Sequence, residues 1–196
     1  MNKEYTIENY TADISVDEYI ARFRDEERIA GFCKGCPNFG KIWSCPPFDF
    51  DTDTFLRQYS HAHLMATKII PLRNDIPKEN AQTFIRSERI RIEGELLEME
   101  CRYGGRAFAN IGGCLHCDSF DCRRKANLPC LYPDRVRPSL EAFGFDIRQT
   151  LKELFGIELL FSKNGKLPAY LVLVTGFFHN EQPISFNGCK ISCNLH

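Results

Sequence analysis

The spacing of apolar and polar residues along the chain predicts its helices. Residues 16–29 predict a helix that ends at Gly31, because apolar side chains recur near one face with charged residues opposite. Residues 78–103 predict the longest helix, which Gly104 and Gly105 end. Two shorter helices are expected, one over residues 54–60 with a cap from Asp51, Thr52 or Asp53, and one from Asp146 to Phe155 with Gly156 closing it.

The strands follow from runs of β-branched and apolar residues between turn signals. We expect a sheet built from residues 61–71, 106–111, 157–162 and 170–178, in which the last two runs form a hairpin around Asn164-Gly165. Residues 1–15 are a polar lead-in, with a short strand as the alternative. The pattern therefore predicts an α+β fold: a single domain over residues 1–196, with a small mixed β-sheet, packed helices and two cysteine-rich metal-binding loops at one end.

The first chemical signal is the density of cysteines between residues 114 and 130. Cys114, Cys117, Cys122 and Cys130 lie within seventeen residues, which exceeds what packing requires. A Cys-x-x-Cys pair brings two sulfur atoms to one ion or cluster, and further cysteines complete its ligands. His116, inside the pair, is expected to hydrogen-bond to a sulfur rather than to bind the metal.

A second cysteine segment comes earlier in the chain, at Cys33, Cys36 and Cys45. Its glycines and prolines predict a rigid loop rather than a helix or a strand. The Cys-Pro that ends it is typical of the cluster-binding loops of ferredoxins, although the spacing differs. Nearby aromatic residues either shield a metal site from water or belong to the core: Phe39, Trp43 and Phe48.

Composition decides between disulfides and metal. The N-terminus has no apolar segment typical of a secretory signal, and no apolar run is long enough to cross a membrane. We therefore expect a cytoplasmic protein whose thiols stay reduced, so that its ten cysteines favour metal over disulfides. The net charge of -1 does not favour nucleic acid as a partner.

Three motifs taken in order resemble one known family. They are Cys-x-x-Cys-Pro-Asn-Phe-Gly-Lys-x-Trp-Ser-Cys-Pro-Pro-Phe, then Gly-Gly-Cys-x-x-Cys with a later Pro-Cys, and Arg-Pro-Ser-Leu-Glu-Ala-Phe-Gly-Phe-Asp-Ile. Over about residues 20–175 the chain resembles domain of unknown function family 2284, the predicted metal-binding proteins of anaerobic bacteria and archaea. The resemblance implies metal binding through these cysteines and assigns no reaction.

The identity of the metal depends on counting ligands. Cys114, Cys117, Cys122 and Cys130 suffice for one four-sulfur site, whereas Cys33, Cys36 and Cys45 need a fourth ligand. That ligand is Cys101, Cys189, Cys193 or a group other than cysteine, unless the fourth position stays open to substrate or ligands cross between the two segments. Iron–sulfur chemistry accounts for more of the cysteines than a zinc ribbon does, so we favour one or two [4Fe-4S] clusters over zinc.

The chemistry leads to two alternatives for function. The first is an iron–sulfur protein that transfers electrons or assists a partner oxidoreductase, and the second is a zinc-stabilised binding module without redox activity. No catalytic motif accompanies the cysteines. Basic residues near the cysteines either offset the negative charge of the ligated clusters, form a solvated face or dock an acidic redox partner: Lys34, Lys41, Arg123, Arg124, Lys125, Arg135 and Arg137.

Overall fold

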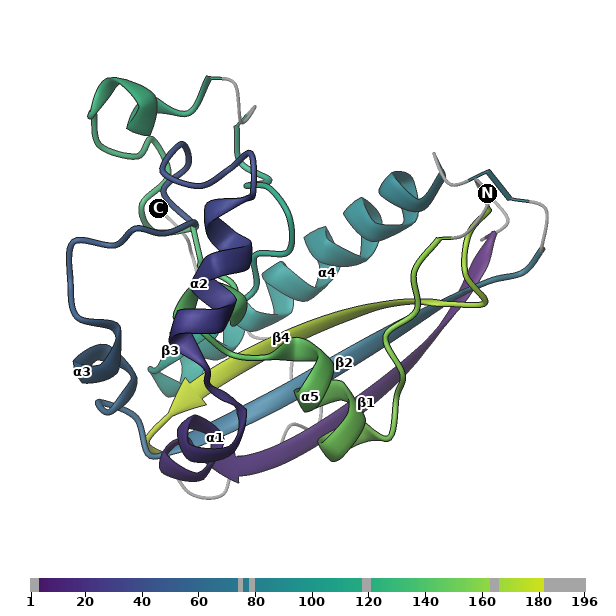
Figure 1. The fold of residues 1–196 in the computed structure, drawn as a ribbon, viewed down its shortest axis with the longest axis horizontal. Coiled ribbons are helices and arrows are strands. Elements are labelled where there is room, and N and C mark those ends of the chain that lie inside the picture. The colour runs from purple at the N-terminus through teal and green to yellow at the C-terminus, as the bar shows by residue number, and fades with distance from the viewer. Residues whose placement is uncertain (1–3, 74–75, 78–79, 118–120, 163–165, 182–196) are drawn as a thin grey trace.

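The fold is a four-stranded sheet between two layers of helices (Figure 1). The structure, a computed structural model, describes residues 4–73, 76–77, 80–117, 121–162 and 166–181. Along the chain, the main elements are β1 (Tyr5–Ser15), α1 (Val16–Phe23), α2 (Glu26–Lys34), α3 (Thr52–Leu56), β2 (His61–Pro71), α4 (Asn80–Tyr103), β3 (Arg106–Phe108), the 3-10 turns η2 (Arg123–Ala126) and η3 (Glu141–Phe143), α5 (Ile147–Phe155) and β4 (Leu171–His179).

The strand order is β1-β2-β4-β3, and every pairing is antiparallel. The α+β prediction is confirmed, but the sheet is entirely antiparallel and not mixed as predicted. β2 and β3 lie within the segments expected for them, and β4 extends one residue beyond its segment, to His179. The sequence does not predict the length of the first strand. β1 is an edge strand that buries few of its side chains, so its residues look like a polar lead-in although they form eleven residue pairs with β2.

The predicted hairpin is wrong, because residues 158–162 form no strand. Leu159 packs against the core instead, and the hydroxyl of Tyr170 donates to the carbonyl oxygen of Glu158 at 2.6 Å. The turn expected at Asn164-Gly165 falls outside the described residues. Apolar residues after α5 thus cover the core without joining the sheet.

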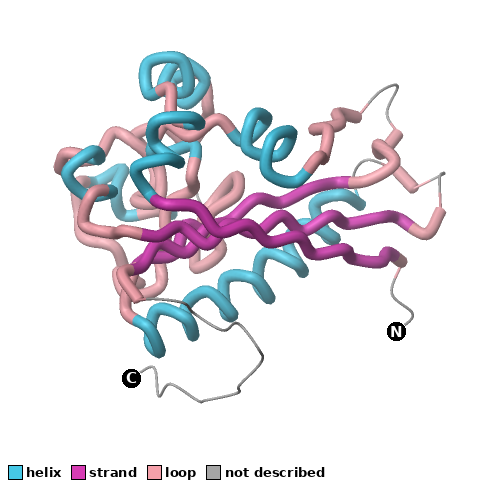
Figure 2. The backbone as a smooth tube through the Cα atoms, turned by 90° about the horizontal axis from the view of Figure 1, so that it is seen from below, coloured by secondary structure: helices cyan, strands magenta, loops and turns pink. Residues whose placement is uncertain are grey.

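Helices cover both faces of the sheet (Figure 2), and a hydrophobic cluster lies on each face. On one face Leu64 and Phe178 pack beneath α1, α5 and the segment around Phe143. On the other face Ile69 and Phe177 pack against the long helix α4. Because side chains alternate along a strand, consecutive residues of β4 serve opposite clusters.

The helix predicted over residues 16–29 is two helices. Arg24 is extended and forms a β-bridge with Phe145, and the amide of Asp25 donates to the carbonyl oxygen of Gly144 at 2.9 Å. The Asp25 side chain then caps α2 by accepting from the amide of Arg28. The helix also does not end at Gly31 as predicted, since α2 continues to Lys34. The break at Arg24 separates the two helices, and Cys33 lies in the last turn of α2.

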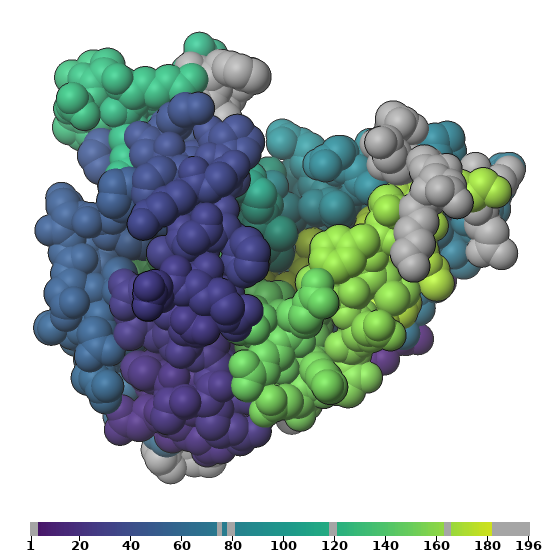
Figure 3. Space-filling view, viewed as in Figure 1, coloured from purple at the N-terminus to yellow at the C-terminus, as the bar shows by residue number. Residues whose placement is uncertain are grey.

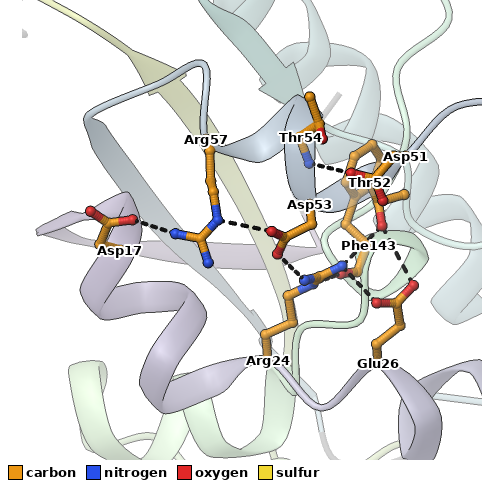
Figure 4. Close-up of polar contacts among 9 residues, drawn as sticks. All are labelled: Asp17, Arg24, Glu26, Asp51, Thr52, Asp53, Thr54, Arg57 and Phe143. Carbon is orange, nitrogen blue, oxygen red and sulfur yellow. Dashed lines mark hydrogen bonds and ion pairs between the residues drawn. The ribbon is translucent and has the colours of Figure 1, made fainter.

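Arg24 holds this break in place (Figure 4). Its guanidinium donates to Asp53 and Glu26 at 2.8 Å, to the hydroxyl of Thr52 at 2.9 Å and to the carbonyl oxygen of Phe143 at 2.8 Å. The Arg24 side chain is only 9% exposed, so these bonds lie largely out of water. They join the start of α2 to α3, and thereby set the position of Cys33.

The remaining helices agree with their predicted caps and stops. Asp51 caps α3 and Asp146 caps α5, each by accepting from an amide three residues on. Gly104 and Gly156 follow α4 and α5 in the left-handed region, at φ +67° and +66°. None of the helices in the described ranges is long and apolar enough to span a membrane.

Candidate metal centre

The first cysteine segment begins on a helix and continues as a chain of tight turns. Cys33 lies in the last turn of α2, which ends at Lys34, and Gly35 is the C-cap. The amide of Cys36 then donates to the carbonyl oxygen of Cys33 at 3.0 Å, and the amide of Cys45 donates to that of Ile42 at 3.2 Å. The predicted rigid loop is therefore found after Cys33, whereas Cys33 itself is helical.

The three thiols of this segment act on one another electrostatically. Burial raises the pKa of the Cys33 thiol first, and Glu141 and Cys36 raise it further. Burial and the neighbouring Cys36 and Cys33 raise the pKa of Cys45 to about 11, against a smaller opposing effect of Arg124. Negative charge on one thiol thus penalises ionisation of the next, which is the situation that a bound cation relieves.

The second cysteine segment follows β3 and is held by residues of α4. Arg89 donates to the carbonyl oxygen of Gly113 and, at 3.2 Å, to the side-chain oxygen of Asn110. Further along, Cys122 is the N-cap of η2, and Asn127 ends that turn in the left-handed region at φ 53°. Cys122 is buried, whereas Cys114, Cys117 and Cys130 are half-buried.

The pKa of Cys117 depends on the other three thiols of this segment. Burial, followed by the nearby Cys114, Cys122 and Cys130, raises the pKa of Cys117 to about 11. The chain thus brings together four sulfur atoms that are up to sixteen residues apart in the sequence. The residues that raise the pKa of Cys117 belong to its own segment, as do the thiols that act on Cys45.

Backbone amides point at two of these sulfur atoms. The amide of His116 donates to the Sγ of Cys114 at 3.5 Å, and the amide of Tyr132 donates to the Sγ of Cys130 at 3.4 Å. The hydrogen bond predicted for His116 therefore comes from its backbone. Its ring instead contacts Glu93 at 3.1 Å and the carbonyl oxygen of Arg135 at 3.2 Å. Hydrogen bonds to ligating sulfur atoms tune a metal–thiolate site.

The two cysteine segments lie against each other at one end of the molecule, where blue and green surfaces adjoin in Figure 3. Arg124, two residues after Cys122, donates to the carbonyl oxygens of Ile42, Cys45 and Pro47. Its guanidinium also lies 5.1 Å from the ring of Trp43.

Two further hydrogen bonds complete this contact. The indole N–H of Trp43 donates to the carbonyl oxygen of Leu128 at 3.1 Å, and the side-chain amide of Asn38 donates to that of Gly112 at 3.0 Å. Trp43 therefore joins the segments rather than packing in the core, while Phe48 packs at the edge of the core cluster.

Glu141 brings a carboxylate to the first cysteine segment. A cavity of about 300 Å³ is lined by Cys33 and Glu141 together. The Oε2 atom of Glu141 is buried and has no hydrogen-bond partner among the described residues, and burial raises the pKa of the carboxyl group. The backbone carbonyl of Glu141 lies 3.9 Å from the Sγ of Cys33.

The thiols are near one another without the geometry of a formed site. Across the described ranges, no group of three or more His, Cys, Asp or Glu side chains is placed to hold a metal ion. The electrostatic effects on Cys45 and Cys117 do not contradict this, because charges interact over longer distances than the ~2.3 Å of a metal–sulfur bond. The donor chemistry suits a thiophilic metal, and binding requires the sulfur atoms to move closer together.

The other sequence predictions divide as follows. Cys101 lies on α4, is exposed and is not among the residues that raise the pKa of Cys33, Cys45 or Cys117, while Cys189 and Cys193 fall outside the described residues. Among the basic residues, Arg137 pairs with Glu100 at 2.7 Å instead of facing a sulfur. Arg124 and Glu141 were not distinguished by the sequence, since one lies in an Arg-Arg-Lys run and the other in an apolar motif.

Comparison with known families matches residues 19–174 to one described as predicted metal-binding protein (DUF2284). This range contains all seven cysteines of the two segments and Glu141, and it ends before Cys189 and Cys193. No curated protein and no solved structure matches the chain.

Proposed function

Because this chain belongs to the DUF2284 family of predicted metal-binding proteins, we propose that it is an iron–sulfur protein. Cys114, Cys117, Cys122 and Cys130 ligate one [4Fe-4S] cluster, and Cys33, Cys36 and Cys45 provide three ligands for a second. The observation that carries the proposal is that four cysteines lie within seventeen residues and that Cys114, Cys122 and Cys130 each raise the pKa of Cys117, so that the four thiols of one cluster's ligand set belong to one segment.

Iron–sulfur chemistry is favoured over zinc by the number and setting of the thiols. A zinc ribbon that pairs Cys33 and Cys36 with Cys114 and Cys117 would leave the later cysteines of both segments without a role. Amide donors to Cys114 and Cys130 suit a cluster, since hydrogen bonds to its sulfur ligands shift the reduction potential of the cluster to less negative values.

Glu141 is our candidate for the fourth position of the first group. It shares a cavity with Cys33, and its Oε2 atom has no partner among the described residues. A carboxylate is a harder ligand than thiolate, so it would leave one iron easier to exchange or to approach. Cys189 and Cys193 remain alternatives for this position.

The proposed role is transfer of single electrons or assistance to a partner oxidoreductase in the cytoplasm. The cations beside the cysteines favour an acidic surface on a redox partner protein. Of these, Lys34, Lys41 and Lys125 are exposed and suit such a surface, whereas Arg124 is engaged within the molecule.

The alternative is a zinc-stabilised binding module. One observation favours it: Arg124, Trp43 and Asn38 already join the two segments. A metal held beside this contact would act as a further structural link between them.

Metal and sulfide analysis of anaerobically purified protein decides between these functions. We expect iron and acid-labile sulfide in similar amounts, and Cys122→Ala should lose about one cluster's worth of iron. Cys101→Ala is the matched control, because that thiol is exposed on α4 and is not among the residues that raise the pKa of Cys117; its iron content should equal that of the wild type. A colourless protein with zinc and no sulfide would establish the binding module instead. Unchanged iron in Cys122→Ala would refute the proposed ligands.

A further inference from the structure

A cavity separate from the thiols lies beside the joined cysteine segments. Its volume is about 460 Å³, which falls in the range of small-molecule sites. It is bounded by the loop that follows Cys45, by the start of β3 at Arg106, and by residues 136–143. None of the cysteines in the described ranges lines it, so its chemistry is distinct from metal ligation.

One side of the cavity is a set of phenylalanine rings in mutual contact. Phe50 stacks on Phe48 with centroids 5.2 Å apart, and lies 5.4 Å from Phe55 and 6.1 Å from Phe143. Phe50 is nevertheless 44% exposed, so this apolar surface is incompletely covered. Rings fixed by their neighbours offer a flat ligand stacking partners at little cost in side-chain entropy.

The cavity is also lined by Arg106, whose guanidinium has a nitrogen without a hydrogen bond. The Nε of Arg106 is buried and has no hydrogen-bond partner within the described part of the chain. The Glu100 carboxylate acts on Arg106 electrostatically, but it already accepts from Arg137 at 2.7 Å and from the amide of Ala107. Burial, followed by the nearby Arg137, lowers the pKa of Arg106, and an anion in the cavity would oppose both effects.

The balance of charge around the cavity also favours an anion. Arg106 and Arg124 line it, and Asp49 is the single carboxylate among its lining residues. Asp49 is exposed, so solvent screens its repulsion of a bound anion more than it screens the attraction of the half-buried Arg106.

We propose that this cavity binds a small aromatic carboxylate, with the carboxylate paired to Arg106 and the ring packed among Phe48, Phe50 and Phe143. A planar guanidinium fork matches a carboxylate, and the apolar wall accounts for the rest of the ligand. The inference does not rest on the metal, because no thiol takes part. The cavity does share Pro47, Phe48 and Phe50 with the smaller cavity that contains Cys33, so an occupant would lie next to the first cysteine segment.

Isothermal titration with phenylacetate tests the proposal on the full chain, purified anaerobically and with its metal content measured first. We expect saturable binding with a dissociation constant below about 1 mM. Phenylacetamide lacks the charge and acetate lacks the ring, so each should bind at least about tenfold more weakly. Trp43, the single tryptophan of the chain, lines the cavity, and its fluorescence should change with the same midpoint.

Three variants locate the site. Arg106→Gln should weaken phenylacetate binding by about tenfold or more, whereas Arg148→Gln, an exposed arginine on α5 outside the cavity, should leave binding unchanged. Should Arg106→Gln fail to fold, Phe50→Ala decides, because this ring lines the cavity and is partly exposed: it should weaken phenylacetate binding severalfold. No binding of phenylacetate, equal binding of the amide, or a Phe50→Ala variant that binds like the wild type would overturn the proposal. These outcomes are independent of the iron and sulfide content.

Discussion

Arg124 contacts three carbonyl oxygens that lie about eighty residues earlier in the chain, those of Ile42, Cys45 and Pro47. A guanidinium has five N–H donors in a fixed plane, so one side chain can satisfy several acceptors of a turn-rich loop. The sequence shows only an Arg-Arg-Lys run after Cys122, in which the three side chains have the same charge. The fold distinguishes them, because Arg124 alone of the three lies over Trp43.

Arg124→Gln should lower the free energy of unfolding by about 1–3 kcal/mol, because it leaves loop carbonyls without their charged donor. The variant should also retain less metal than the wild type. Arg123→Gln removes the same charge one residue earlier and serves as the control. Urea unfolding under anaerobic conditions measures both, and equal stability of the two variants would contradict the role given to Arg124.

At the scale of the element, the junction between α4 and β3 contains two consecutive glycines with different structural roles. Both have a positive φ, +67° at Gly104 and +87° at Gly105. A Cβ at Gly104 would meet nothing within 4 Å, whereas one at Gly105 would lie 2.3 Å from the carbonyl oxygen of Phe178. The sequence predicts a helix stop from either glycine, but only the pairing of β3 with β4 makes Gly105 indispensable.

Gly105→Ala should therefore destabilise the protein by about 2–3 kcal/mol more than Gly104→Ala does. Gly104→Ala should cost only about 1 kcal/mol, the penalty of a left-handed residue. Thermal or urea unfolding of the two variants side by side gives the comparison. If both alanines cost the same, the close approach to Phe178 is not the reason for the glycine.

At the scale of the molecule, the sheet and the cysteine segments are stabilised by different means. Neither of the two hydrophobic clusters includes any of the seven cysteines. The segments depend instead on turns, on the contact made by Arg124 and, as we propose, on metal. Phe48 and Phe143 are where the two parts touch, since both pack at the sheet and line the larger cavity.

Removing the metal should therefore open the cysteine segments while the sheet stays folded. After anaerobic chelation, hydrogen exchange should speed up by at least about tenfold in residues 36–45 and 121–130, as expected for local opening. The amides of β2 and β4 should keep their protection, with α4 as an internal reference. Simultaneous loss of protection in the sheet would mean that metal and core form one cooperative unit.

Much of this protein follows from its sequence alone. The positions of β2 and α4, the caps at Asp51 and Asp146 and the two groups of cysteines depend on local periodicity, capping and spacing, which act within a few residues. The break at Arg24, the strand β1 and the absence of a strand over 158–162 do not. Each is decided by a partner far along the chain, such as Phe145 for Arg24 or β2 for β1.

The same division applies to the candidate site. Spacing alone selected Cys114, Cys117, Cys122 and Cys130 as one group and Cys33, Cys36 and Cys45 as another. Only the tertiary structure brings Arg124 to the first group, Glu141 to the cavity of Cys33 and Arg106 to an aromatic wall. Those contacts join residues that are far apart in the sequence. They form because the packing of the helices on the sheet brings these segments to one end of the molecule, and no local pattern encodes that packing.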